Sequence, residues 1–182
     1  MFRAFRNSRV TAFFGVLTGL CLAIQLAPRP PNVEFTSLFA FTVGFLFGPF
    51  VGAFFGSFVM FVNGFFSPWG FAGLNMPFQI FGMGIVGTVG GLYKKYTRNP
   101  TPIEAAILGA ILTVFYDLVT NVGMALFYMS IGTDPTLAII TALGYGTPFS
   151  LIHIASNIAV FGIAFFPLIK AVNQILVVKK IG

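Results

Sequence analysis

The stretch FTSLFAFTVGFLFGPFVGAFFGSFVMFVNGFF, residues 35–66, contains no charged residue and decides how many helices the chain forms. A helix needs about 20 apolar residues to cross the hydrocarbon core of a bilayer. The stretch is therefore either one very long helix or two helices in succession. The segment FGPFVG at 47–52 is the natural break, because glycine permits a tight turn and proline is favoured at the first position of a helix.

The basic residues favour two helices over one, because lysine and arginine accumulate on the cytoplasmic side of membrane proteins. With two helices in this stretch, and the N-terminus inside, only Arg29 lies outside the cell. The cytoplasmic set is then Arg3, Arg6, Arg9, Lys94, Lys95, Arg98, Lys170, Lys179 and Lys180. A single helix would move most of these residues to the outside.

We therefore predict six transmembrane helices with cytoplasmic N- and C-termini. Their expected ranges are Arg9–Ala27, Phe35–Gly48, Phe50–Phe66, Met76–Tyr93, Ile103–Met129 and Thr147–Ala171. The second helix is short for a membrane span, and we expect either neighbouring helices to support it or an ordered loop to cap it.

The composition agrees with an all-α membrane protein. Of the 182 residues, 57% are hydrophobic and only 8% are charged, which is far from the composition of a soluble domain. Apolar runs recur throughout, so we expect residues 1–182 to form one multi-pass transmembrane domain in the plasma membrane. The net charge of +6 is explained by the cytoplasmic clusters, and we expect no nucleic-acid partner.

Three loops are predicted on the outside, at Ala27–Glu34, Ser67–Pro77 and Ile131–Pro148. They hold most of the prolines, whose fixed φ angle makes a loop stiff. Stiff loops suit the rim of a binding site, although ordinary surface turns would have a similar composition.

Polar residues on two predicted helices fall at matched depths. At 1.5 Å per residue, Asp117 and Asn157 lie roughly 18 Å above the inner boundary, and Asn121 and His153 lie roughly 24 Å above it. Gln79 on the fourth helix falls near the upper level, with Asn75 at the rim. The two stripes indicate either a polar seam between packed helices or a pocket open to the outside.

The expected roles of these polar residues depend on their depth in the membrane. We expect Asp117 to be structural, paired with Asn157 or with Asn121 of its own helix, and to form the floor beneath a pocket. Gln79, Asn121 and His153 lie nearer the outer mouth and are either ligand contacts or structural bonds. The remaining candidates for substrate binding are Asn75, Asn157, Trp69, Glu34 and Tyr145.

Several kinds of chemistry have no signature in the sequence. There is no G-x-x-x-x-G-K-[ST] loop for ATP, and no Ser/His/Asp or Cys/His constellation stands out. One histidine and one intramembrane acid do not form a pattern of metal ligands. We therefore expect no enzyme activity, no cofactor and no metal.

The first helix carries a stripe of small residues, Gly15, Gly19 and Ala23, at intervals of four. Such a stripe permits close approach of another helix, either within the bundle or from another protein.

These features together resemble the S-components, the substrate-binding membrane subunits, of energy-coupling factor (ECF) vitamin transporters. The similar stretches are PNVEFTSLFAFTVGFLFGPFVGAFFG (31–56), YDLVTN (116–121) and TPFSLIHIASNIAVFGIAFFPLI (147–169). The resemblance implies that the chain binds a vitamin or vitamin precursor from outside between the later helices and the loops above them. It also implies partners, namely a coupling transmembrane subunit and two ATPase subunits.

The family's A-x-x-x-A contact motif for the coupling subunit maps onto Gly15, Gly19 and Ala23, with glycine in place of alanine twice. For the substrate, the resemblance favours the branch of cobalamin and corrinoid carriers. Thiamine-type sites place aromatic residues and an acid at the pocket, and Glu34, Trp69 and Tyr145 are candidates for that arrangement.

Two other functions remain open from the residues alone. One is a self-sufficient ion-coupled carrier that uses Asp117 and His153. The other is a membrane scaffold without a ligand, in which the glycine stripe serves assembly.

Overall fold

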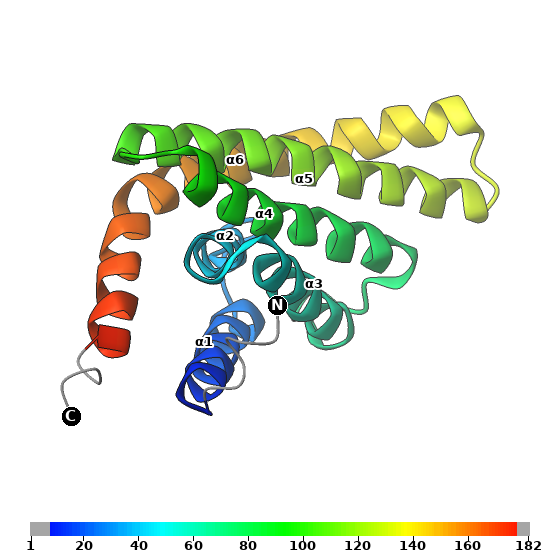
Figure 1. The fold of residues 1–182 in the computed structure, drawn as a ribbon. Coiled ribbons are helices and arrows are strands. Elements are labelled where there is room, and N and C mark those ends of the chain that lie inside the picture. The colour runs from blue at the N-terminus through cyan, green and yellow to red at the C-terminus, as the bar shows by residue number, and fades with distance from the viewer. Residues whose placement is uncertain (1–7, 178–182) are drawn as a thin grey trace.

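The computed structural model describes residues 8–177, which form six α-helices and one short 3₁₀ helix without any strand (Figure 1). Residues 1–7 and 178–182 lie outside the described part, and with them Arg3, Arg6, Lys179 and Lys180 of the predicted cytoplasmic set. The helices are α1 (Ser8–Leu26), α2 (Thr36–Phe47), α3 (Pro49–Phe66), η1 (Gly73–Asn75), α4 (Met76–Tyr96), α5 (Pro102–Ser130) and α6 (Pro135–Val177).

The predicted break in the apolar stretch is confirmed. α2 ends at Phe47 and α3 begins at Pro49, with Gly48 between them at a φ of 99°. Only glycine adopts such a φ readily, and the fixed φ of proline suits the first position of a helix. Two separate helices therefore replace one long one.

The first five helices begin and end within three residues of the predicted positions, but both ends of the sixth were predicted wrongly, because α6 extends from Pro135 to Val177 instead of from Thr147 to Ala171. Residues 131–148 were expected to be a loop, whereas α6 begins at Pro135. The carboxylate of Asp134 accepts hydrogen bonds from the backbone N–H groups of Thr136 and Leu137 at 3.0 and 3.1 Å, as an N-cap does. Pro148, read as a loop marker, lies inside the helix.

α5 and α6 form an antiparallel hairpin that runs along one side of the molecule (Figure 1). The C-terminal part of α6 turns away from α5. Two prolines inside α6, Pro148 and Pro167, each remove a backbone hydrogen bond and permit such bending.

α2 lies at the centre of the bundle, and every residue from Thr36 to Phe45 is buried. Its phenylalanines contact aromatic rings of α6, with Phe41 at 5.4 Å from Phe161 and 5.3 Å from Phe165 between ring centroids. Because α2 is enclosed by other helices, its short length of 12 residues leaves little of it facing lipid.

Glycines let α2, α3 and α4 approach one another closely. A Cβ added at Gly87 of α4 would overlap the carbonyl of Gly52 on α3, and one at Gly44 of α2 would overlap the carbonyl of Gly87. The close contact leaves no room for a side chain at position 87 of α4 or at position 44 of α2.

Three helices of the described part are long and apolar enough to cross a membrane, at Pro49–Phe66, Pro102–Ser130 and Pro135–Ile175. Two shorter apolar helices accompany them, at Thr11–Leu26 and Thr36–Phe47. Large hydrophobic side chains are exposed on all the long helices, including Phe54, Ile111 and Ile163. A surface of this kind is typical of contact with lipid.

Candidate functional site

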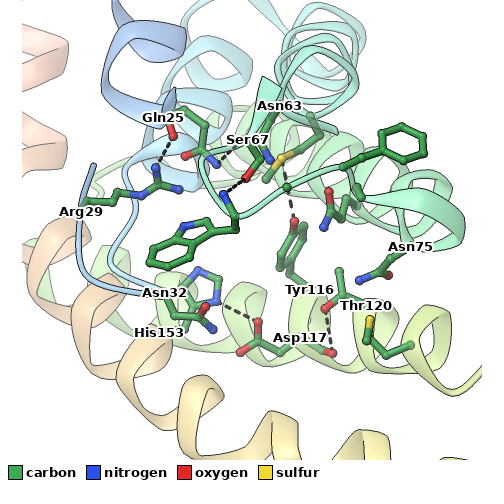
Figure 2. Close-up of a pocket in the computed structure, with 17 residues that line it drawn as sticks. Gln25, Arg29, Asn32, Asn63, Ser67, Asn75, Tyr116, Asp117, Thr120 and His153 are labelled. Carbon is green, nitrogen blue, oxygen red and sulfur yellow. Dashed lines mark hydrogen bonds and ion pairs between the residues drawn. The ribbon is translucent and has the colours of Figure 1, made fainter. Parts of the chain in front are cut away.

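A cavity of about 400 Å³ opens between α1, α3, α4, α5 and α6, beneath the loops that follow α1 and α3 (Figure 2). Its size falls within the range of pockets that enclose small molecules, about 300–1,000 Å³. Amide, hydroxyl and aromatic side chains dominate its lining: Gln25, Arg29, Asn32, Met60, Asn63, Ser67, Trp69, Phe71, Asn75, Gln79, Tyr116, Asp117, Thr120, Met124 and His153.

Three charged or ionisable side chains form a chain of contacts at one side of this cavity. Nδ1 of His153 lies 2.8 Å from Oδ1 of Asp117, and Nε2 lies 3.2 Å from Oε1 of Glu34. All three residues are buried. We call Glu34, His153 and Asp117 the acid–histidine network.

The network constrains the protonation of the histidine. Neutral imidazole has one N–H group, and a carboxylate only accepts hydrogen bonds. Both contacts of His153 are hydrogen bonds when the ring carries two protons or when one carboxyl group is protonated. An imidazolium ion between two carboxylates satisfies both contacts and leaves the network with one net negative charge.

Glu34 reaches this position because it also caps α2. Its carboxylate accepts hydrogen bonds from the backbone N–H of Ser37, at 3.0 and 3.3 Å to the two oxygens. Burial by itself would raise the pKa of Glu34, but hydrogen bonds and the charge of His153, together with Ser37, lower it to about 2. Through its contact with His153, Glu34 connects the loop between α1 and α2 to α6.

Asn157 and Thr113 extend the acid–histidine network by further hydrogen bonds. Nδ2 of Asn157 donates to Oε1 of Glu34 at 3.3 Å and to Oγ1 of Thr113 at 2.8 Å. Asn157 is fully buried. It therefore links α5 and α6 to the loop before α2 without lining the cavity.

A second polar cluster joins α1 to α2 and α3 across the cavity from Asp117. Nε2 of Gln25 donates to Oδ1 of Asn63 at 3.2 Å, and Oε1 of Gln25 accepts from Thr36 at 2.7 Å. The guanidinium of Arg29 donates to the carbonyls of Gln25 and Val33, the latter at 2.9 Å. Figure 2 shows Gln25 and Arg29 on the side opposite Thr120 and Asn75.

Of the eight residues predicted to bind substrate, the structure brings four to the cavity: Trp69, Asn75, Gln79 and His153. Two others lie behind the lining: Glu34 contacts the lining residue His153, and Asn157 contacts Glu34. The last two, Asn121 and Tyr145, do not line this cavity, and Tyr145 is exposed on α6. Their assignment to a ligand remains a prediction that the geometry does not support.

The predicted pairing of depths was wrong by one helical turn. Asp117 was matched to Asn157, and Asn121 to His153, but Asp117 contacts His153. The amide of Asn121 packs against Gly146 instead, where an added Cβ would overlap it. Depth along the sixth helix was counted from Thr147, but α6 begins at Pro135, so the counted levels did not fix which residues of α5 and α6 face each other.

The polar stripe on α5 is narrower than predicted. Asp117, Thr120 and Met124 line the cavity, but Asn121 does not. At 100° per residue, positions i+3 and i+7 lie on one side of position i and position i+4 lies on the other. Asn121 is therefore turned toward α6.

Sequence reasoning missed several lining residues, among them Gln25, Arg29 and Tyr116. Gln25 lies near the end of the first predicted helix, Arg9–Ala27, and an amide within a membrane helix indicates a polar neighbour. No signal in the sequence alone brings Arg29 or Tyr116 to the cavity, because their positions follow from how the helices pack.

The described residues contain no group of three or more His, Cys, Asp or Glu side chains that is placed to hold a metal ion. The acid–histidine network is a chain of hydrogen bonds rather than a set of ligands around one point. What the arrangement can do chemically is bind a polar molecule by hydrogen bonds and aromatic contacts.

The small-residue stripe of α1 faces outward. Gly15, Gly19 and Ala23 are exposed, and nothing lies within 4 Å of a Cβ added at either glycine. The stripe therefore does not pack within the described part of the chain.

Comparison with known proteins identifies one family. The family model for the ECF transporter substrate-specific component matches residues 9–181. No curated protein and no solved structure matches the chain.

Proposed function

Because the chain belongs to the family of substrate-specific components of ECF transporters, we propose that it captures a vitamin or vitamin precursor from outside the cell in the cavity described above. Family membership makes it a substrate-binding membrane subunit and not an enzyme. The observation that carries the proposal is the cavity itself, which lies at the level of the acid–histidine network. It is bordered by two of the three loops that are predicted to be outside, Ala27–Glu34 and Ser67–Pro77.

We further propose that all six helices cross the plasma membrane and that both termini are cytoplasmic. The enclosure of α2 by other helices supports this arrangement, because it removes the objection that α2 is too short to match the bilayer. The cluster of Lys94 and Lys95 in the last turn of α4, at the end opposite Asn75, also agrees with it.

The proposed partners are a coupling transmembrane subunit and two ATPase subunits, which the family's function requires for transport. The exposed stripe of Gly15, Gly19 and Ala23 is the proposed contact with the coupling subunit. An exposed small-residue stripe is suited to close helix packing with a second protein.

The size of the cavity bears on which vitamin is bound. Resemblance favoured cobalamin or a related corrinoid, a macrocycle with a large nucleotide loop. A cavity of about 400 Å³ favours a vitamin of one or two small rings, because pockets commonly bury most of the surface of their ligand. We therefore place a small-ring vitamin ahead of a corrinoid.

Ligand identification tests the proposal. The protein is purified from cells grown with a mixture of vitamins, and it is then washed and denatured. The small molecules that it releases are identified by mass spectrometry. The expected result is one vitamin or precursor at near-stoichiometric amount. A Gln79→Leu variant prepared in parallel should release less of it, whereas Gln174→Leu, the same change on an exposed surface of α6, should release as much as the native chain.

An empty protein that also binds no member of a vitamin panel in calorimetry would contradict the proposed function. A bound lipid or detergent as the sole released molecule would contradict it as well.

A further inference from the structure

Three buried side-chain oxygens of cavity-lining residues, in Asp117, Gln79 and Asn75, have no hydrogen-bond partner among the described residues. Oδ2 of Asp117 is buried and unpaired, although Oδ1 of the same carboxyl group contacts His153. Oε1 of Gln79 is likewise buried and unpaired. Both side chains line the cavity, and Asp117 is only 7% exposed.

These atoms require a donor. A carboxylate oxygen and an amide oxygen both accept hydrogen bonds, and leaving a buried acceptor unpaired costs free energy. Asn75 also has an unpaired oxygen, but that oxygen packs against Gly123 of α5. Asp117 and Gln79 are therefore the positions at which a ligand's donor groups would be satisfied.

The charges of the side chains around the cavity restrict the class of ligand that can bind there. The acid–histidine network holds two carboxyl groups and one imidazole, so its net charge is negative when the imidazole is fully protonated and both acids are ionised. Arg29, the one Lys or Arg side chain among the residues that line the cavity, donates to the backbone carbonyls of Gln25 in α1 and of Val33 in its own loop. A carboxylate ligand placed at Asp117 would meet repulsion, whereas a cation or a neutral N–H group would be attracted.

Aromatic side chains supply flat walls. Trp69, Phe71 and Tyr116 all line the cavity, and the rings of Trp69 and Phe71 stand exposed near its mouth. Such rings stack on planar ligands, and their faces attract cations.

We propose that the molecule bound here is a nitrogen-rich, neutral or cationic ring compound that presents N–H donors to Oδ2 of Asp117 and Oε1 of Gln79. This inference rests on the proposed function and specifies the substrate class of the same cavity. It excludes ligands whose only polar group is a carboxylate.

Four probes test the class. Thiamine and pyridoxamine carry amino groups and positive charge, while nicotinate and lipoate are carboxylates without an N–H group. Binding of each to the purified full chain is measured by calorimetry at pH 7. At least one amino compound should bind about tenfold or more tightly than either carboxylate, because an ionic hydrogen bond is involved.

Substitutions locate the contact. Asp117→Asn should weaken binding of the amino compound by about 10- to 100-fold. Asp134→Asn is the matched control, since it removes the same charge at an exposed helix cap far along the α5–α6 hairpin. If Asp117→Asn fails to fold, Gln79→Leu is the alternative test of the contact. The side chain of Gln79 has no hydrogen bond in the described structure, so its replacement removes none.

The outcomes separate the two proposals. Tighter binding of a carboxylate, or amino-compound binding that neither Asp117→Asn nor Gln79→Leu weakens, overturns the ligand class. Failure of all four probes to bind also overturns it. In each of these cases the proposed function stands if ligand identification finds another vitamin in the purified protein, and falls if it finds none.

Discussion

Replacing Glu34 with alanine should destabilise the fold more than any other single change of a carboxylate. The substitution removes the acceptor for Nε2 of His153, for Nδ2 of Asn157 and for the backbone N–H of Ser37. Breaking a buried ion pair costs about 3–5 kcal/mol, because the remaining charge is left without a partner. At about 2–4 °C per kcal/mol for a chain of this size, the midpoint of thermal unfolding should fall by about 6–20 °C.

The assay is thermal unfolding in detergent, followed by size-exclusion chromatography with fluorescence detection. Glu104→Ala is the matched control, because Glu104 is exposed and its carboxylate caps α5 through the N–H of Thr101 at 3.1 Å. Loss of a helix cap costs about 0.5–2 kcal/mol. If Glu34→Ala lowers the midpoint no more than Glu104→Ala does, the acid–histidine network does not hold the loop to α6.

A double substitution isolates the pair of Glu34 and His153. His153→Phe keeps a ring of similar size and removes both contacts of the imidazole. Residues in one hydrogen-bonded network are not additive, and the interaction energy is about 0.5–3 kcal/mol. The double variant should therefore be more stable than the sum of the single effects predicts. Full additivity would refute the contact.

Three further predictions address acid stability, helix packing and coupling. Because the folded protein lowers the pKa of Glu34 to about 2, its stabilising contribution should be constant above about pH 4.5 and fall as the pH drops toward 2; Glu34→Gln should remove this part of the acid dependence. Gly87→Ala should destabilise by about 3 kcal/mol or more through overlap with the carbonyl of Gly52, whereas Gly144→Ala, with open space around it, should stabilise by about 0.5–1 kcal/mol; both are read from unfolding midpoints. Gly19→Leu should leave ligand affinity unchanged but abolish uptake in cells that also contain the coupling and ATPase subunits, and normal uptake would rule out this face as the coupling contact.

Local features of the sequence predicted most helix ends. The break at Gly48 and Pro49 depends only on the conformations that these two residues allow, and charge distribution then supported it. The same rules failed at Gly144, Gly146 and Pro148, which were read as loop markers. Gly146 is needed instead for the approach of Asn121 across the hairpin, and that is a tertiary contact that no local pattern reveals.

The sequence predicted some of the polar residues of the candidate site, but not which of them contact each other. Asp117 and His153 were both recognised because ionisable residues are rare within membrane helices. The depth count paired Asp117 with Asn157, one turn along α6 from His153, because the contact depends on how α5 and α6 pack. The role of Glu34 could not be predicted, because a loop residue becomes buried only when α2, α5 and α6 assemble around it.

Whether this cavity holds the transported molecule is tested most directly by tryptophan fluorescence. Trp69 is the only tryptophan of the chain and lines the cavity. Titration of the purified protein with the vitamin found by ligand identification should change the Trp69 emission in a saturable manner, with the same dissociation constant that calorimetry gives. A vitamin that binds in calorimetry while the Trp69 emission stays unchanged throughout the titration would contradict the placement of the ligand in this cavity.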